Sequence, residues 1–536
     1  MNKKAIIVTG LALISLLLAP LLPSVSQRAF AACATYDSAN NRIIVNCNTT
    51  LPQVASEINN PAIIEDKGNG EYIIRATLQT SHAKLIISSA DGVSWLKFTG
   101  DNGLYYYYAN AAISGVKITS WDETTNSTID NQGSAARAWI RFYKTTDALI
   151  QNSELAYLGH GTDASSKRGI SFDGLGSTNV HIDNSEFHHD HYAFYSSNLA
   201  NSDIKNSNYH DNDKYDIDPH TGTNNFVIAN NHIHNSQSKF GIICSLNCYA
   251  ITIEGNSIEG SPSSGVSFSR NMHNSIVRNN VIFNTPSALY VGQSPDNEIY
   301  GNTIHDVGRG IYFVNPTTTT DGVTQNNFAH DNTISKATYG IISNNSPINT
   351  VKNNNLDSAT ISYEYYLTYD SKLIIDSQTF NSDKIRGVSG TNTIEIRNSG
   401  NISIDVGAPI DTDATPYSTT LTNRIITVNT VSDTTPPPDT IRPSVKITSP
   451  ANGVTLSGNI TIHVNGTASD ADSGVKTVQV HVDTGAYQTA VPKAPGDWST
   501  WSIDLSITTP GTHKIQARVT DNAGNQNWYS INVTIT

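Results

Sequence analysis

The central part of the chain repeats one short phrase in which apolar and polar residues alternate before an Asn or Gly. Two copies are Ile182–Phe187 and Ile253–Ile258, and further copies follow roughly every 22–25 residues, a period typical of solenoids. Alternation with a period of two indicates a β-strand, and the Asn or Gly indicates a turn. Leucine-rich repeats share the period but need Leu at fixed spacing, which is absent. The pattern therefore predicts an all-β chain whose main body is a right-handed parallel β-helix.

A second strand of each repeat is visible in runs such as Tyr192–Phe194, Tyr215–Ile217 and Phe240–Ile242. In a β-helix, equivalent positions on neighbouring coils stack about 4.8 Å apart, so columns of side chains can be read from the sequence. Asn tolerates left-handed backbone angles, and stacked Asn side chains hydrogen-bond to one another. We therefore assign a structural role to the turn residues Asn231, Asn256, Asn280, Asn302, Asn332 and Asn354.

Changes of pattern divide the chain into five parts. Residues 1–32 combine lysines, an apolar stretch and an Ala-x-Ala site, as in a signal peptide, with an uncleaved membrane anchor as the alternative. Residues 33–130 are expected to form an N-terminal cap and the first coils, because an open solenoid end would be a reactive edge. Residues 131–430 form the catalytic-like β-helix. A Pro-rich linker at 431–443 precedes evenly spaced short strands at 444–536, which predict an Ig-like β-sandwich.

Charge and cysteine content narrow the partners and the compartment. The formal net charge is −13 and no long basic run exists, which excludes nucleic acid as a partner and requires a local basic patch for any anionic ligand. Cys33 and Cys47 flank a short segment of an exported chain, which favours a disulfide. Cys244 and Cys248 could close a tight loop with a second disulfide. Cys244 also fits a buried apolar position on a strand.

One coil differs from the others because it carries Asp218, Pro219 and His220 shortly after Tyr215. Pro interrupts a strand ladder and here fixes the path between an acid and a histidine. Stacking places Tyr195 beside Asp218. The preceding coil offers a further group of polar rings: His188, His189, His191, Tyr192 and Tyr195. Such a face suits proton abstraction next to a carboxylate, with surface polar residues that have no role as the alternative.

Residues from about 137 to 300 resemble the catalytic β-helix of mannuronan C5-epimerases. The matching residues are Arg137, Leu158-Gly159, Ile182–Phe187, Tyr192–Tyr195, Tyr215–His220, Gly241–Ile243, Ser264–Val266 and Arg270-Asn271. The resemblance implies that His220 removes the C5 proton of a uronate, that Asp218 orients His220 or the sugar, and that Tyr215 returns a proton from the opposite face. It also implies a reaction that needs no organic cofactor and turns mannuronate into guluronate within the polymer.

Three positions depart from the family pattern. Thr221 stands where an acid usually follows the histidine, Phe240 where His is common, and Leu246 where an Arg neutralises the uronate carboxylate. Arg270 falls in the same column as Leu246, one coil further along, so we expect it to take over this role together with Lys239. The substrate-binding candidates are Arg270, Lys239, Lys214, Tyr195, Tyr192 and His191.

The first hypothesis is therefore a secreted C5-epimerase that acts on an alginate-like acidic polysaccharide. A non-catalytic extracellular or cell-surface protein that binds polysaccharide, and a uronan lyase, are the alternatives. A hydrolase needs two carboxyls on opposite sides of the bond, whereas Asp216 and Asp218 lie on one strand and are expected to face the same way. We expect no catalytic metal. Structural Ca²⁺ could bind in carboxylate-rich turns. We also expect that the Ig-like domain can attach the protein to a cell surface and that the protein is a monomer.

Overall fold

The computed structural model describes residues 32–376, apart from 132–133, 161–166, 238, 317–321 and 358. It also describes 385–388, 392–397, 402–405, 425–428 and 442–536, apart from 458–459, 472 and 484. The signal peptide expected at 1–32 and the linker expected at 431–443 fall almost wholly outside the described residues. No helix in the described part of the chain is long and apolar enough to cross a membrane.

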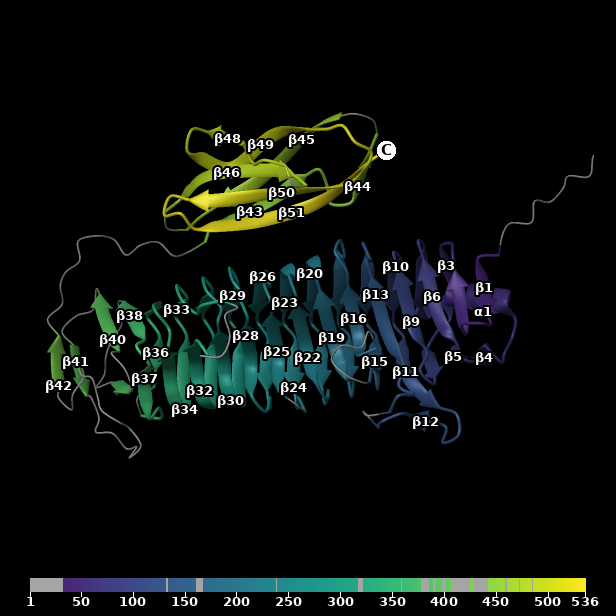
Figure 1. Ribbon diagram of the computed structural model, residues 1–536, viewed down its shortest axis with the longest axis horizontal. Coiled ribbons are helices and arrows are strands. Elements are labelled where there is room, and N and C mark those ends of the chain that lie inside the picture. Colours follow the sequence, from purple (N-terminus) through teal and green to yellow (C-terminus); the bar gives the residue numbers. More distant parts are fainter. Residues whose placement is uncertain are drawn as a thin grey trace, which may run out of the picture. The chain divides into compact units, whose positions relative to one another are not determined.

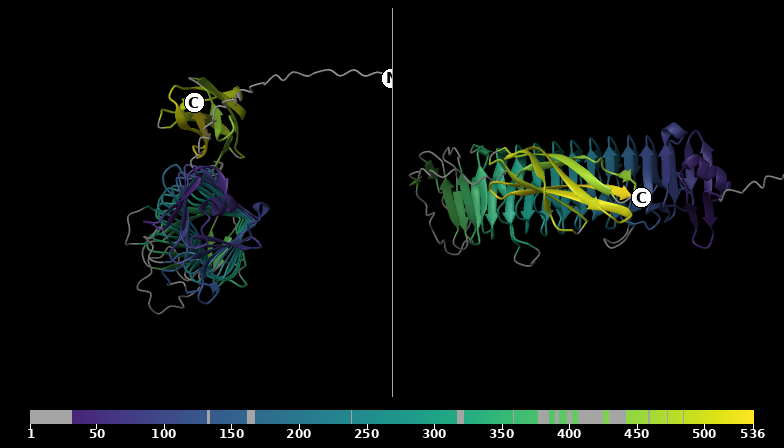
Figure 2. Two further views of the ribbon diagram at one scale, coloured as in Figure 1. Left: turned by 90° about the vertical axis from the view of Figure 1, so that its right-hand side faces the viewer. Right: turned by 90° about the horizontal axis from the view of Figure 1, so that it is seen from above.

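The main body is a parallel β-helix in which each coil passes through three stacks of strands (Figure 1). We name the three stacks sheet 1, sheet 2 and sheet 3, in the order in which a coil passes through them. The coils superpose in the end-on view of Figure 2, as stacking of equivalent positions requires. The predicted fold class is confirmed.

Sheet 1 holds one strand from each coil. Its members are β3 (Thr49–Thr50), β7 (Lys84–Ser88), β10 (Asn110–Ser114), β14 (Ala148–Gln151), β17 (Val180–Asp183), β20 (Ala200–Lys205), β23 (Asn224–Ala229), β26 (Tyr249–Glu254), β29 (Ile276–Arg278), β31 (Glu298–Tyr300), β33 (Phe328–His330), β35 (Asn349–Lys352), β38 (Lys372–Asp376) and β40 (Thr393–Arg397).

Sheet 2 holds the short second strand of each coil, and the hairpin strand β4 (Ile64–Gly68) and β12 (Ser127–Thr128) pair with it. Its members are β5 (Glu71–Ile74), β8 (Trp95–Thr99), β11 (Lys117–Asp122), β15 (Glu154–Ala156), β18 (Glu186–His188), β21 (Asn208–His210), β24 (His232–His234) and β27 (Ser257–Glu259).

Sheet 3 holds the third strand of each coil and begins where β1 (Ala34–Asp37) pairs with β2. Its members are β2 (Arg42–Val45), β6 (Thr77–Ser81), β9 (Gly103–Tyr107), β13 (Trp139–Tyr143), β16 (Gly169–Asp173), β19 (Tyr192–Ser197), β22 (Tyr215–His220), β25 (Phe240–Ser245) and β28 (Ser264–Ser269).

The later coils lose the corner between sheets 2 and 3. Here β30 (Val281–Gly292), β32 (Thr303–Val314) and β34 (Thr333–Asn344) each run through both sheets. Three shorter strands, β36 (Asn355–Leu356), β37 (Tyr363–Thr368) and β39 (Ile385–Val388), continue them. The hairpin of β41 (Ile402–Asp405) and β42 (Ile425–Val428) is antiparallel, which agrees with the expected decay of the repeat.

A short helix, α1 (Leu51–Ile58), lies in the N-terminal region that was expected to cap the solenoid. Thr50 and Gln53 form a reciprocal capping box at its start, and Asn59 ends it in the left-handed conformation. Leu51 and Val54 point into the core of the first coils, and this apolar contact fixes the helix on the solenoid.

The interior of the β-helix combines an apolar core with a ladder of buried amides. Asn231, Asn256 and Asn280 each donate from Nδ2 to Oδ1 of the next turn asparagine at 2.9–3.0 Å, and the ladder continues through Asn302 and Asn332. Each of these amides also donates to a backbone carbonyl, so the buried polar groups are satisfied. The structural role assigned to the turn asparagines is confirmed.

The cysteines divide differently from the prediction. Cys33 and Cys47 form a disulfide. Cys244 and Cys248 do not, so the second disulfide is wrong: both thiols are free and buried. The Cys244 side chain points into the apolar core from β25, and the Cys248 thiol donates to the carbonyl of Ser245. Both residues therefore act as small apolar core residues, which was the alternative for Cys244.

The C-terminal part is a β-sandwich with a core of its own around Val464, Val480 and Val533. One sheet contains β43 (Ser444–Ser449), β45 (Ile460–Ser469), β49 (Asp497–Ile507) and β48 (Val491–Ala494). The other contains β44 (Val454–Leu456), β51 (Gln526–Ile535), β50 (Gly511–Asp521), β46 (Val475–Val482) and β47 (Gln488–Thr489). Mainly antiparallel pairing within two sheets is the Ig-like arrangement that the strand spacing predicted.

Candidate active site

Four adjacent strands of sheet 3, β19, β22, β25 and β28, carry the polar cluster that the sequence singled out. Phe194, Ile217 and Ile242 point into the core, so the residues that alternate with them toward the end of each strand face outward. The register places Tyr195 beside Asp218, and it aligns Ser197, His220 and Ser245 in one row. The columns inferred from the repeat therefore exist in the fold.

Arg270 reaches back across two coils to contact His220. It occupies a left-handed corner directly after β28, with φ of 56°, and its Nη2 lies 3.3 Å from His220 Nε2 and 3.2 Å from Ser245 Oγ. A guanidinium can only donate, so Nε2 must be the acceptor and the imidazole proton sits on Nδ1. Nδ1 lies 2.7 Å from Thr221 Oγ1 and donates a hydrogen bond to it. Arg270 and Thr221 together fix the tautomer of His220.

The surroundings keep His220 neutral. Burial lowers the pKa of His220 to about 4, and the nearby guanidiniums of Arg270 and Arg168 act in the same direction. Nε2 of the imidazole is therefore unprotonated at neutral pH, which is the form that can accept a proton once Arg270 moves away.

Tyr195 is the phenol whose ring lies beside the imidazole. The ring centroids of Tyr195 and His220 are 5.6 Å apart, and the guanidinium carbon of Arg168 lies 3.9 Å from the Tyr195 ring. Burial raises the pKa of Tyr195, so the phenol carries its proton at neutral pH. Asp218, its neighbour in the next coil, is almost completely buried. An acid, a neutral base and two guanidiniums thus share one face.

Tyr192, Tyr215 and Phe240 form an aromatic row beside this cluster. The Tyr192 and Tyr215 ring centroids lie 5.3 Å apart, and those of Tyr215 and Phe240 lie 5.8 Å apart. The row occupies the start of each strand, whereas His220 stands at the end of β22. Tyr215, the proton donor suggested by the resemblance, is therefore placed further from His220 along the strand than Asp218 is.

The remaining binding candidates line the edge of the face. One column consists of the residues just before the first paired position of β16, β19, β22 and β25. Its members are Arg168, His191, Lys214 and Lys239. His191 Nδ1 lies 2.6 Å from Asp213 Oδ1, and Lys239 is exposed. The column adds positive charge along one rim of sheet 3.

Asp216 faces the interior, so the expectation that it shares the facing of Asp218 is wrong. Its side chain is fully buried, where the Asn212 amide donates to Oδ1 at 2.7 Å and the Ser236 hydroxyl donates to Oδ2. These inward donors replace water and hold the carboxyl inside. Burial raises the pKa of Asp216 to about 7.

Sequence reasoning missed Arg168, and it gave no role to Thr221 or Ser245 at the site. Arg168 directly precedes Gly169, the residue that pairs with Tyr192, so the same column arithmetic could have placed it at the rim. The side-chain contact with Tyr195 depends on how the arginine folds over the face, which no repeat pattern contains.

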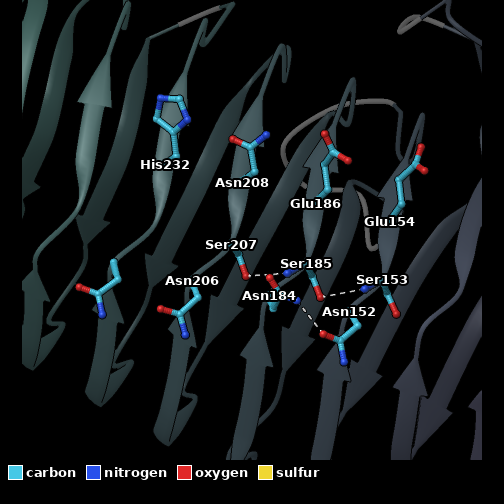
Figure 3. A pocket seen from close by; sticks show the side chains of 11 residues that line it. Asn152, Ser153, Glu154, Asn184, Ser185, Glu186, Asn206, Ser207, Asn208 and His232 are labelled. Carbon is cyan, nitrogen blue, oxygen red and sulfur yellow. Dashed lines mark hydrogen bonds between the residues drawn. The ribbon is translucent and has the colours of Figure 1, made fainter.

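A separate hollow, the corner groove, runs between sheets 1 and 2 and has a volume of about 590 Å³ (Figure 3). It is lined by Asn152, Ser153, Glu154, Asn184, Ser185, Glu186, Asn206, Ser207, Asn208, Asn230 and His232. His188 and Lys117 already bind Glu154, and they lower the pKa of that carboxyl to about 2. The groove has space, but none of the residues that line it is a Lys or Arg, so the sheet 3 face is the better candidate for an anionic ligand.

We looked for a possible metal site in the part of the chain that the structure describes. Within those residues, no group of three or more His, Cys, Asp or Glu side chains is arranged to hold a metal ion. The groups on the sheet 3 face are instead suited to moving a proton beside an anionic ligand.

Curated relatives match part of the chain. A mannuronan C5-epimerase of Pseudomonas putida is 27% identical over 248 residues, covering 44% of this chain and 47% of that protein. A mannuronan C5-epimerase of Azotobacter vinelandii is 28% identical over 145 residues, covering 25% of this chain and 27% of that protein. The chain thus spans less than half of the length of these relatives.

Structural comparison supports the fold. A double mutant of the periplasmic alginate epimerase AlgG superposes with a TM-score of 0.51 at 18% identity, covering 67% of this chain and 84% of that one. A bacterial Ig domain profile matches residues 443–517. The profile described as right handed beta helix region matches residues 102–282 and 220–380, which together exceed half of the chain. The chain therefore belongs to the right-handed β-helix family.

Proposed function

We propose that this chain is a C5-epimerase that acts on uronate residues of an alginate-like acidic polysaccharide. The observation that carries the proposal is the neutral imidazole of His220, held beside the Arg270 guanidinium with a buried phenol alongside. The similarity to mannuronan C5-epimerases names the substrate class. The excess of basic groups on an outer face of an acidic chain supports an anionic ligand.

The substrate itself would free the base. Arg270 Nη2 donates to His220 Nε2 and so occupies the electron pair that must accept the C5 proton. A uronate carboxylate is a stronger acceptor for a guanidinium than an imidazole is, because charge-assisted bidentate bonds form. Transfer of Arg270 to the carboxylate releases Nε2 and neutralises part of the local positive charge, which raises the pKa of His220 toward a working value.

The reaction then balances as two proton transfers. His220 Nε2 takes the C5 proton and becomes imidazolium, while the electron pair left on C5 delocalises into the carboxylate that Arg270 neutralises. The Tyr195 phenol gives its proton to the other face of C5, which inverts the centre. Exchange with water returns a proton to the phenolate and removes one from the imidazolium. These steps need no organic cofactor.

Incubation of polymannuronate with the chain in deuterated water tests the proposal. Proton NMR should show new guluronate signals with deuterium at C5. His220→Ala should abolish both the guluronate signals and the exchange at C5. His232→Ala, which changes a histidine of the corner groove, should retain both.

Other outcomes would select one of the alternatives. Unsaturated chain ends would show a lyase, in which the same carbanion expels the 4-linked sugar. No exchange at C5 on any uronan tested would reduce the face to a polysaccharide-binding surface, with Arg270 permanently bound to His220.

A further inference from the structure

The outer face of sheet 3 is poor in carboxylates compared with the chain as a whole. Between β13 and β32, its outward positions carry two carboxylates among the described residues, Asp173 and Asp218, in a chain with a net charge of −13. Asp173 is paired with Arg141, whose Nε lies 2.9 Å from Oδ2. A polyanion can therefore follow this face along the solenoid and meet little like charge.

An aromatic cluster with a cation lies on this face towards the N-terminus. We call Tyr107, Tyr108, Tyr143 and Lys144 the N-side cluster. The Tyr107 and Tyr143 rings stack at 5.7 Å, and Lys144 Nζ lies 5.1 Å from the Tyr108 ring centroid. Tyr108 is 40% exposed, and Lys144 has no acidic partner within the described residues. Tyrosine rings and an unpaired ammonium are suited to a sugar ring and its carboxylate.

A second cluster of the same kind lies towards the C-terminus. We call Tyr290, Arg309 and Tyr312 the C-side cluster. The guanidinium carbon of Arg309 lies 5.2 Å from the Tyr312 ring centroid, and the Tyr290 and Tyr312 rings meet edge to face at 5.6 Å. Arg309 is exposed and forms no ion pair in the described part of the chain. It therefore offers a second carboxylate-binding position.

The two clusters bracket His220 at equal separations. Tyr143 precedes the His220 coil by three coils, through β13, β16, β19 and β22. Tyr290 follows it by three coils, through β22, β25, β28 and β30. At about 4.8 Å per coil, the nearer edge of each cluster lies about 14 Å from His220 along the axis, and its far edge lies one coil further. A sugar bound at His220 is too short to reach either cluster, whereas a polymer parallel to the axis reaches both.

We propose that the N-side and C-side clusters are distal anchors that hold an acidic polysaccharide parallel to the solenoid axis, so that long chains are preferred over short ones. The inference rests on the proposed function for the identity of the polymer. Its physical basis is multivalency: once the centre is occupied, binding at each anchor is intramolecular and adds affinity without any change at the reacting sugar.

Binding of polymannuronate and of tetramannuronate to the full-length chain tests the anchors. The double variant Lys144→Ala/Arg309→Ala should weaken polymannuronate binding by about tenfold or more and change tetramannuronate binding by less than about twofold. Lys205→Ala, which removes one positive charge from sheet 1, should leave both unchanged. Arg309→Lys in the Lys144→Ala background should recover part of the loss, and matched melting temperatures would show that folding is intact.

Three results would overturn the inference: equal weakening for both ligands, no weakening for the polymer, or no binding of polymannuronate by the unmodified chain. The proposed function is separable, because binding is measured without turnover. Loss of polymer binding in the double variant together with no C5 exchange in the unmodified chain would retain the anchors and reject the epimerase. Normal C5 exchange in the unmodified chain, together with unchanged polymer binding in the double variant, would retain the epimerase and reject the anchors.

Discussion

The outer face of sheet 3 and the corner groove are built on the same coils, yet they differ in what they offer a ligand. The corner groove has the volume, but its carboxylate Glu154 is bound by His188 and Lys117. The sheet 3 face carries a neutral imidazole at His220, with the guanidiniums of Arg270 and Arg168 nearby. A solenoid repeats its shape on every coil, so a hollow recurs easily, whereas a chemical cluster requires particular residues on neighbouring coils.

The largest effect that separates the two regions should come from matched histidine substitutions. His220→Gln removes the base and should lower turnover of polymannuronate by about 10²–10⁴-fold, the usual contribution of a general base. His232→Gln, in the corner groove, should leave turnover within about twofold. The measurement is the initial rate of C5 exchange by NMR. Equal losses in both variants would move the chemistry away from sheet 3.

Arg270→Ala should lower turnover by about 10²–10³-fold, the scale of one lost preorganised donor. The pKa of His220 should rise from about 4 toward its ordinary value, because one of the positive charges that depress it is gone. Titration of the His220 ring protons by NMR measures this without substrate, and the acid limb of the pH–rate profile should move up with it.

Arg278→Ala is the control for this substitution, since Arg278 binds Glu254 on sheet 1. An unchanged His220 titration in Arg270→Ala would mean that the contact between the two side chains does not exist in solution.

Asparagines of the buried ladder and asparagines of the corner groove should differ in their contribution to stability. Asn280→Ala removes the acceptor of the buried Asn256 amide and one donor to Asn302 Oδ1, and it should lower the unfolding free energy by about 1–3 kcal/mol. Asn184→Gly, in the corner groove, keeps the positive φ accessible and should change it by less than about 0.5 kcal/mol. Denaturant unfolding measures both. A larger loss in Asn184→Gly would show that the groove, not the ladder, organises the coil.

The last effect is a pH dependence of stability beneath the site. Burial raises the pKa of Asp216 to about 7, above the ordinary value of 3.8, so the folded state binds more protons than the unfolded state between these values. The contribution of this carboxyl is fully present below pH 3.8 and is lost as the pH rises to about 7, by at most about 1.4 kcal/mol per pH unit. Asp216→Asn should flatten this slope in melting temperatures measured from pH 5 to 8.

The fully buried Asp190 carboxyl, whose pKa burial also raises, stays in place in Asp216→Asn and should keep its own contribution to the slope. An unchanged total slope would show that Asp216 ionises without penalty.

The repeat contained enough information to predict the β-helix, the turn asparagines and the columns on sheet 3. A fixed period forces equivalent residues to stack, so Tyr195 and Asp218, or His220 and Ser245, become neighbours whatever the details of the backbone. The Ig-like sandwich was equally visible, because short strands and turn signals recur at regular spacing.

Only the tertiary structure decided the contacts that depend on side-chain reach and facing. Arg270 spans two coils from a left-handed corner to His220, and Arg168 folds over Tyr195. The repeat specifies the position of a Cα, but it does not specify the rotamer of a long side chain. The same limit explains the errors: Cys244 and Asp216 both turn inward, where core packing and buried donors hold them. The sequence alone determined which residues share a column, and the packed fold decided which of their atoms meet.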